Sequence, residues 1–164
     1  MQKITPFLWF EKNNAEEAMN YYVSVFKNAK IVEIARYPSG MTEGPMKGMD
    51  GKVLTGVFEI EGQRFMAIDG GPGVWSFTGA ISFLVECEDR AELDAYWSKL
   101  SAVPEAEQCG WCKDKFGISW QIAPKGMSDM MNGPDKEKSG RAMQAMLKMK
   151  KIDLAELQKA YDGN

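Results

Sequence analysis

The order of secondary-structure signals in the first half of the chain is repeated in the second half. A short apolar run, Ile4–Phe10, leads into a helical stripe behind Asn14, and a second run, Ala80–Cys87, leads into another stripe behind Asp89. In both places a glutamate stands three residues after the candidate N-cap, which is the pattern of a capping box. Four pairs of stripe residues are each 74 positions apart, namely Met19 and Leu93, Tyr22 and Tyr96, Val23 and Trp97, and Phe26 and Leu100.

Strand-like runs follow each helix. Those after the first helix are Ile31–Tyr37, Val53–Ile60 and Gln63–Asp69, and those after the second are Glu105–Lys113 and Gly117–Ala123. Between the second and third of these runs, Glu61-Gly62 is typical of a hairpin turn. The sequence therefore indicates a strand, a helix and then two or three strands, twice over. The alternative is that two unrelated αβ units share a spacing by chance, because amphipathic stripes are common.

The last quarter of the chain has a different pattern. A short turn is expected at 128–131, and apolar residues then recur at helical spacing in the list Ala142, Met143, Met146, Leu147 and Met149. Asp153 with Glu156 begins a last helix. The methionines favour core or dimer packing over an adaptable binding groove, because they sit at helical spacing. We predict one domain, 1–124, with modules at about 1–72 and 78–124, and a helical extension at 125–164.

Composition excludes several classes of function. The chain has 164 residues, a net charge of −3 and no histidine. The missing imidazole removes Ser-His and Cys-His nucleophile pairs and the commonest zinc ligand. A nucleic-acid binder needs a basic face, and a membrane span needs about 18 apolar residues; neither pattern is present. Three cysteines without a signal peptide favour a reducing compartment, so we expect a cytoplasmic protein.

Five segments resemble one protein family. They are ITPFLWFEKNNAEEAMNYYVSVFKNAKI (4–31), FEIEGQRFMAIDGGP (58–72), AISFLVECED (80–89), QCGWCKDKFGISWQIAP (108–124) and AMLKMKKID (145–153). The chain is similar to the PhnB-like, "3-demethylubiquinone-9 3-methyltransferase" branch of the glyoxalase/bleomycin-resistance/dioxygenase (vicinal oxygen chelate) superfamily. The resemblance implies an α+β fold of tandem βαβββ modules, a cupped mixed sheet around a small-molecule cavity, and a homodimer.

The resemblance also says where a metal would bind. Metal-dependent members hold their ion with four His, Glu or Gln residues, on the first strand and a late strand of each module. The matching positions here are Thr5, Ala80, Gln121 and one near Met66–Ile68, next to Asp69. Thr5 and Ala80 cannot replace an imidazole, and one amide oxygen cannot hold a divalent ion alone. We therefore predict no metal and no other cofactor.

Two further motifs have the wrong context for the chemistry they suggest. The segment IDGGPG (68–73) has the glycines of an S-adenosylmethionine loop, but it leads into a strand-like run where such a loop begins a helix. Cys109 and Cys112 have C-x-x-C spacing, but residues three apart in a strand are about 10 Å apart and point to opposite faces. We interpret both cysteines as small strand residues.

Strand alternation predicts which side chains line the implied cavity. If Thr5 faces inward, then Phe7 and Trp9 share its face; Ala80 brings Ser82 and Leu84, and Gln121 brings Ser119 and Ala123. The predicted ligand-binding residues are Thr5, Phe7, Trp9, Asp69, Ser82, Ser119 and Gln121. Two aromatic rings and several neutral hydrogen-bonding groups suit a small, partly aromatic ligand. The alternative is that Phe7 and Trp9 only fill the core.

Three functions fit these observations. The leading hypothesis is a metal-free protein that binds a small organic molecule. The second is an enzyme of the same superfamily, either a metal-dependent lyase or dioxygenase or the methyltransferase of the family's name. The third is a dimeric domain whose cavity is vestigial. No nucleic-acid or membrane partner is expected.

Overall fold

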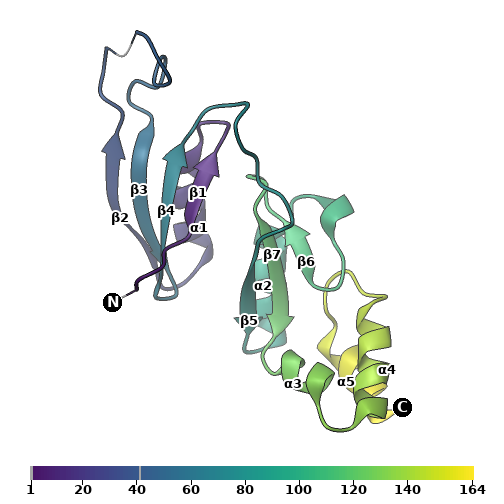
Figure 1. Cartoon of the computed structure of the whole chain (residues 1–164). Coiled ribbons are helices and arrows are strands. Elements are labelled where there is room, and N and C mark those ends of the chain that lie inside the picture. Colours follow the sequence, from purple (N-terminus) through teal and green to yellow (C-terminus); the bar gives the residue numbers. More distant parts are fainter. Residues whose placement is uncertain (1, 41) are drawn as a thin grey trace. The chain divides into compact units, whose positions relative to one another are not determined.

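The computed structural model describes residues 2–40 and 42–164, so that Met41 of the 38–51 loop lies outside the described residues. The chain forms two compact units, one ending at Phe77 and one beginning at Thr78 (Figure 1). The 125–164 extension belongs to the second unit. None of the helices in the described part of the chain is long and apolar enough to cross a membrane.

The first unit is a four-stranded sheet with one helix. Its elements are β1 (Phe7–Phe10), α1 (Ala15–Val25), β2 (Ala29–Arg36), β3 (Val53–Ile60) and β4 (Gln63–Asp69). The strand order is β1-β4-β3-β2, with β1 parallel to β4 and the other pairs antiparallel. The predicted strand, helix and three strands are confirmed in this unit.

Helix α1 covers one face of this sheet. Its stripe buries Ala15, Ala18, Met19 and Tyr22, and the Tyr22 ring stacks on Phe58 of β3 at a centroid distance of 6.1 Å. A close approach is possible because β3 has a glycine under the helix: a Cβ at Gly56 would come within 2.5 Å of the Met19 sulfur. The apolar face of α1 therefore determines which face of the sheet is covered.

The hairpin between β3 and β4 has the predicted turn. Glu61 and Gly62 both have positive φ, 46° and 80°, as a type I′ turn requires. The Glu61 carboxylate also accepts hydrogen bonds from the backbone N–H and the side-chain amide of Asn28, which precedes β2. These bonds lower the pKa of Glu61 and tie the turn to the beginning of β2.

The N-terminus of α1 differs from the prediction. The Asn14 side chain makes no cap hydrogen bond. Its place is taken by Asp69 at the end of β4, whose Oδ1 accepts from the Ala15 N–H at 2.8 Å while Oδ2 accepts from the Val53 N–H at 2.8 Å. The side chain that satisfies the helix end thus comes from a distant strand. In α2 the predicted cap is confirmed, since Asp89 accepts from the Glu92 N–H at 2.8 Å.

The second unit repeats the plan with a shorter sheet. Its elements are β5 (Ser82–Cys87), α2 (Arg90–Leu100), the 3₁₀ helix η1 (Pro104–Ala106), β6 (Trp111–Lys113) and β7 (Ser119–Pro124). The strand order is β5-β7-β6, with β5 parallel to β7 and β6 antiparallel to it. The predicted α+β class and the repeated module are confirmed, with two strands after the second helix.

The predicted strand Glu105–Lys113 is wrong over most of its length. Pro104 has no N–H to donate to a sheet and occupies the first position of η1. Cys109 and Gly110 have positive φ, 53° and 84°, and make a tight turn before β6. Cys109 is therefore a turn residue, whereas Cys112 lies in a strand as expected.

The C-terminal extension folds into three helices. They are α3 (Met127–Asn132), in place of the expected turn, α4 (Lys136–Met146) and α5 (Leu154–Asp162). The 149–152 segment docks them on the unit, because the Cys109 and Gly110 N–H groups donate to the carbonyls of Met149 and Lys150 at 2.8 and 2.7 Å. Along the predicted stripe of α4, Ala142 is buried, whereas Met143 and Leu147 are exposed.

Asp69→Asn should destabilise the protein. The amide group cannot accept, so either the Ala15 or the Val53 N–H loses its partner in a site where Asp69 is only 2% exposed. We expect a loss of about 1–3 kcal/mol in the free energy of unfolding, measured by urea titration. Hydrogen exchange at Ala15 and Val53 should accelerate. Exposed Asp129→Asn is the control, and equal stability of the two variants would contradict this role.

Candidate functional site

The face of the first sheet opposite α1 carries a row of apolar side chains. Phe7 lies beside Met66, and Trp9 beside Ile68, in the parallel β1–β4 pair. Val57 of β3 continues the row from Met66. Phe7 is 51% exposed, whereas its chain neighbour Leu8 is buried on the α1 side. The sheet therefore has one packed face and one open, apolar face.

A charged row bounds this open face on one side. Glu59 of β3 forms ion pairs with Lys30 of β2 at 3.2 Å and with Arg64 of β4 at 3.0 Å. The hydrogen bonds from Arg64 and then from Lys30 lower the pKa of Glu59. The three charges are paired with one another and sum to one positive unit. The row therefore marks the edge of the apolar surface.

Trp9 is the most closely held side chain of the open face. Its ring lies over Gly70, where an added Cβ would come within 1.9 Å of the indole. Trp75 packs against it edge-on at a centroid distance of 4.7 Å. The Trp9 Nε1 atom is buried and has no acceptor among residues 2–40 and 42–164. A buried donor without an acceptor costs about 1–3 kcal/mol.

The open face of the second sheet is more polar. Ser82 of β5 lies beside Ser119 of β7, and Leu84 lies beside Gln121. The Gln121 amide donates to the Ser82 hydroxyl at 2.9 Å. Leu84 is 56% exposed, and Trp111 of β6 lies on the other side of Gln121. The register also places Lys113 of β6 beside Ser119 and Glu86 of β5 beside Ala123. This face therefore combines neutral hydrogen-bonding groups with apolar and charged ones.

The structure places four predicted site residues on open faces with part of their surface exposed: Phe7, Trp9, Ser82 and Gln121. Ser119 shares the face of Gln121 but is buried. Thr5 is half-buried just before β1. Asp69 is different, because its carboxylate lies on the α1 side and both of its oxygens accept backbone hydrogen bonds. We correct its place in the candidate set: Asp69 has a structural role and does not line an open face.

Asp114, between β6 and β7, is a second buried carboxylate, and the sequence analysis did not single it out. Its Oδ1 accepts from the backbone N–H groups of Phe116 and Ile118, at 2.8 and 3.0 Å. Its Oδ2 accepts from the Trp120 indole at 2.8 Å. These bonds hold the turn between β6 and β7, so Asp114 shapes the second sheet and has no free oxygen aimed at an open face.

Two of the three cysteines are inert in their surroundings. Cys87 and Cys112 are buried, and burial raises the pKa of each thiol to about 12. Within the described ranges, no group of three histidine, cysteine or acidic residues is placed to hold a metal ion. The 70–81 segment after β4 has no helix, so the glycines at 70, 71 and 73 do not form a strand-to-helix turn.

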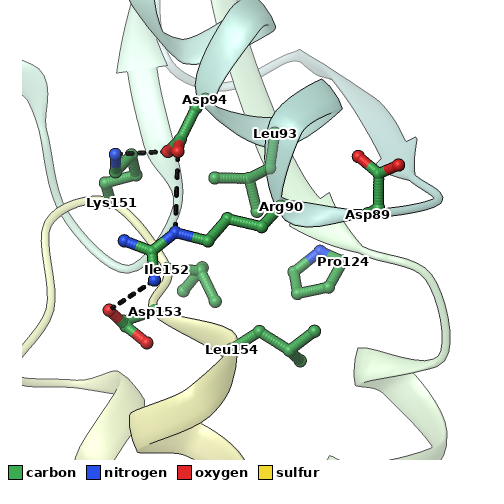
Figure 2. A pocket seen from close by; sticks show the side chains of 9 residues that line it. All are labelled: Asp89, Arg90, Leu93, Asp94, Pro124, Lys151, Ile152, Asp153 and Leu154. Carbon is green, nitrogen blue, oxygen red and sulfur yellow. Dashed lines mark hydrogen bonds and ion pairs between the residues drawn. The ribbon is translucent and has the colours of Figure 1, made fainter.

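A hollow in the second unit lies where the extension docks (Figure 2). It is lined by Asp89, Arg90, Leu93, Asp94, Pro124, Lys151, Ile152, Asp153 and Leu154. Its volume of about 20 Å³ is far below the several hundred Å³ of small-molecule sites. Asp94 pairs with Lys151 and with Arg90, and Arg90 also pairs with Asp153. The hollow is a small gap in the packing between α2 and the extension.

The sequence matches the model of one protein family, described as 3-demethylubiquinone-9 3-methyltransferase, over residues 2–123. The chain belongs to this family. The match contains both modules and stops before the extension, so the family region of the PhnB-like chain ends at β7.

The chain is also similar to several solved structures. A putative 3-demethylubiquinone-9 3-methyltransferase, PhnB protein, from Bacillus cereus is 40% identical, with a TM-score of 0.62 over 75% of this chain and 99% of its own. A Staphylococcus aureus protein is 32% identical over 74% of this chain and 94% of its own, with a TM-score of 0.34. Protein PA1353 from Pseudomonas aeruginosa is 17% identical, covers 76% and 98%, and shares the fold at a TM-score of 0.57. None of the curated proteins compared with the chain matches it.

Thiol reactivity should differ among the three cysteines. A thiol whose pKa is raised to about 12 stays protonated at pH 8, so Cys87 and Cys112 should react with a disulfide reagent only when the protein unfolds. Half-buried Cys109 should react first. The measurement is thiol release over time in native buffer and in guanidinium. Cys109→Ser should remove the early phase; an early phase that survives this substitution would contradict the assignment.

Proposed function

We propose that this PhnB-like protein binds a small organic molecule on the open faces of its sheets, and that it does so without a metal. The carrying observation is that each sheet has one packed face and one face that keeps exposed apolar side chains, such as Phe7 and Leu84. Exposed apolar patches beside neutral hydrogen-bonding groups are typical of binding surfaces. Burial of a ligand's apolar surface there supplies the affinity.

The polar groups of the second sheet would orient the ligand. The Ser82 hydroxyl and the Gln121 amide already form a pair at 2.9 Å, so both are held in place before a ligand arrives. Such preorganised groups lose little side-chain entropy on binding. The first sheet offers a separate surface, formed by the aromatic rings of Phe7 and Trp9.

The metal-free part of the proposal rests on the chemistry of the donors. The chain has no histidine. The buried carboxylates of Asp69 and Asp114 are occupied by backbone and indole N–H groups. Gln121 offers a single amide oxygen, and a divalent ion needs several ligands.

We further propose that the protein is a cytoplasmic homodimer. The support is the resemblance to its family and two exposed apolar residues, Met143 of α4 and Leu147 just after it. The net charge of −3 gives no support for a nucleic-acid partner.

A ligand screen by thermal shift tests the proposal. In buffer with a metal chelator, a compound that binds the folded state should raise the melting temperature. Phe7→Ala should weaken the binding of a compound that occupies the first sheet, and Gln121→Leu that of a compound that occupies the second. In each case we expect about a three- to tenfold loss, because the substitution removes one good contact of roughly 1 kcal/mol. The control is Val32→Ala, an exposed residue at the bulge of edge strand β2. Compounds that bind only with added metal, or equally well to all variants, would contradict the proposal.

The alternative is the methyltransferase activity that the family description and the name of the 40% identical Bacillus cereus relative suggest. A glycine-rich S-adenosylmethionine loop of the Rossmann kind joins a strand tightly to a helix, and β4 is followed by a segment without a helix. We therefore expect no calorimetric signal when S-adenosylmethionine is titrated into the protein. Binding in the micromolar range would favour the methyltransferase.

A further inference from the structure

One face of the Trp9 indole is seated against the backbone at Gly70. Gly70, over which it lies, donates its N–H to the Phe10 carbonyl at 3.1 Å. The next residue, Gly71, donates its N–H to the side-chain oxygen of Asn13 at 2.9 Å. Any side chain at position 70 would collide with the ring. The position of the Trp9 ring is therefore determined by the end of β1 and the loop after β4.

The indole N–H groups of Trp120 and Trp9 differ in whether they have a hydrogen-bond acceptor. The Trp120 Nε1–H donates to Asp114 at 2.8 Å. The Trp9 Nε1–H is also buried, yet it has no acceptor among the described residues. Buried indole N–H groups usually have a partner, because the loss of water is otherwise not compensated. A donor that is fixed in place and unpaired fits an acceptor supplied from outside the protein.

The surroundings of this donor indicate the chemistry of that acceptor. The side chains nearest to Trp9 on this face of β1 and β4 are Phe7, Met66 and Ile68, all apolar. Arg64, in the charged row, is four residues along β4 from Ile68, or about 13 Å. At that distance Arg64 cannot compensate the lost hydration of a carboxylate beside Trp9, whereas a carbonyl or ether oxygen on an apolar ring loses much less hydration.

Trp75 is the group that an entering ring would displace. It packs edge-on against Trp9, but 63% of its surface is exposed. Moving it therefore uncovers little buried apolar surface. A flat ring in its place would keep the aromatic contact and bring an acceptor toward Nε1.

We propose that Trp9 Nε1 is a hydrogen-bond donor to the ligand, and that the ligand is an uncharged apolar ring compound that carries an acceptor oxygen. This inference rests on the proposed function and narrows its ligand class. The Trp9 N–H group would donate a hydrogen bond to this oxygen. The contact between the Trp9 ring and Gly70 fixes the position and direction of that N–H group.

The test compares two probes that share a ring framework, 1-tetralone with a carbonyl and tetralin without one. The five tryptophans give separate indole N–H signals in a proton–nitrogen NMR spectrum, and Trp9→Phe identifies the Trp9 signal by its loss. 1-Tetralone should move the Trp9 signal downfield, as a new hydrogen bond does, and tetralin should not. The Trp120 signal is the internal reference, because Asp114 already holds that donor.

Affinities provide the second measurement. Trp9→Phe should weaken the binding of 1-tetralone about fivefold, which corresponds to the loss of one neutral hydrogen bond. The affinity for tetralin should stay nearly unchanged. Trp97→Phe on α2, also half-buried, is the matched control and should change neither. Tighter binding of 1-naphthoate than of 1-tetralone would overturn the uncharged ligand class.

The outcomes separate this inference from the proposed function. If both probes shift signals from Phe7 or Gln121 but leave the Trp9 N–H unmoved, the donor role is wrong and the proposed function stands. If tetralin moves the Trp9 signal as far as 1-tetralone does, the contact is only apolar and the donor role is again wrong. If neither probe changes any signal while other compounds succeed in the thermal-shift screen, the ligand class is wrong; failure of the whole screen contradicts the proposed function itself.

Discussion

The carboxylate of Asp69 holds the first unit together at one point. It joins the first N–H of α1 to the first N–H of β3 from its position at the end of β4. The Tyr37 hydroxyl donates to the Asp69 carbonyl, and burial, followed by the charge of Asp69, raises the pKa of Tyr37. Because α1 is fixed to this face, the opposite face of the sheet is left without a helix. The candidate binding surface of the first unit is this uncovered face.

Much of this arrangement could be predicted from the sequence. The alternation of a strand has a period of two, so Phe7 and Trp9 share a face whatever packs on it, as do Ser82 with Leu84 and Ser119 with Gln121. The hairpin at Glu61-Gly62 was predictable because few residue pairs accept positive φ at both positions. Local rules were sufficient for these features.

Features that depend on distant residues could not be predicted in this way. Asn14 has the residue type of an N-cap, but a carboxylate from β4 takes its place. Asp69 was assigned to the cavity, because nothing in its own strand says which face a helix will cover. The Trp9 N–H group has no acceptor among the described residues. Whether an acceptor lies near it depends on the tertiary structure. Cys109 occupies a turn because Gln108 bridges to Trp111, which leaves Cys109 and Gly110 as the two turn residues with positive φ.

The two units use the same construction for different chemistry. The first presents an aromatic and aliphatic surface, whereas the second presents hydroxyl and amide groups held by their own hydrogen bond. The extension, outside the region matched by the family, is docked by backbone hydrogen bonds and by ion pairs around Arg90 and Lys151. It adds to the second unit without using its open face.

A crystal structure of the protein with a compound from the ligand screen, grown in the presence of a metal chelator, tests the central claim most directly. The account predicts electron density for the compound on an open sheet face, against side chains such as Phe7, Trp9 or Gln121, with no metal ion between compound and protein. A compound found under α1, in the hollow beside Arg90, or coordinated through a metal would contradict it.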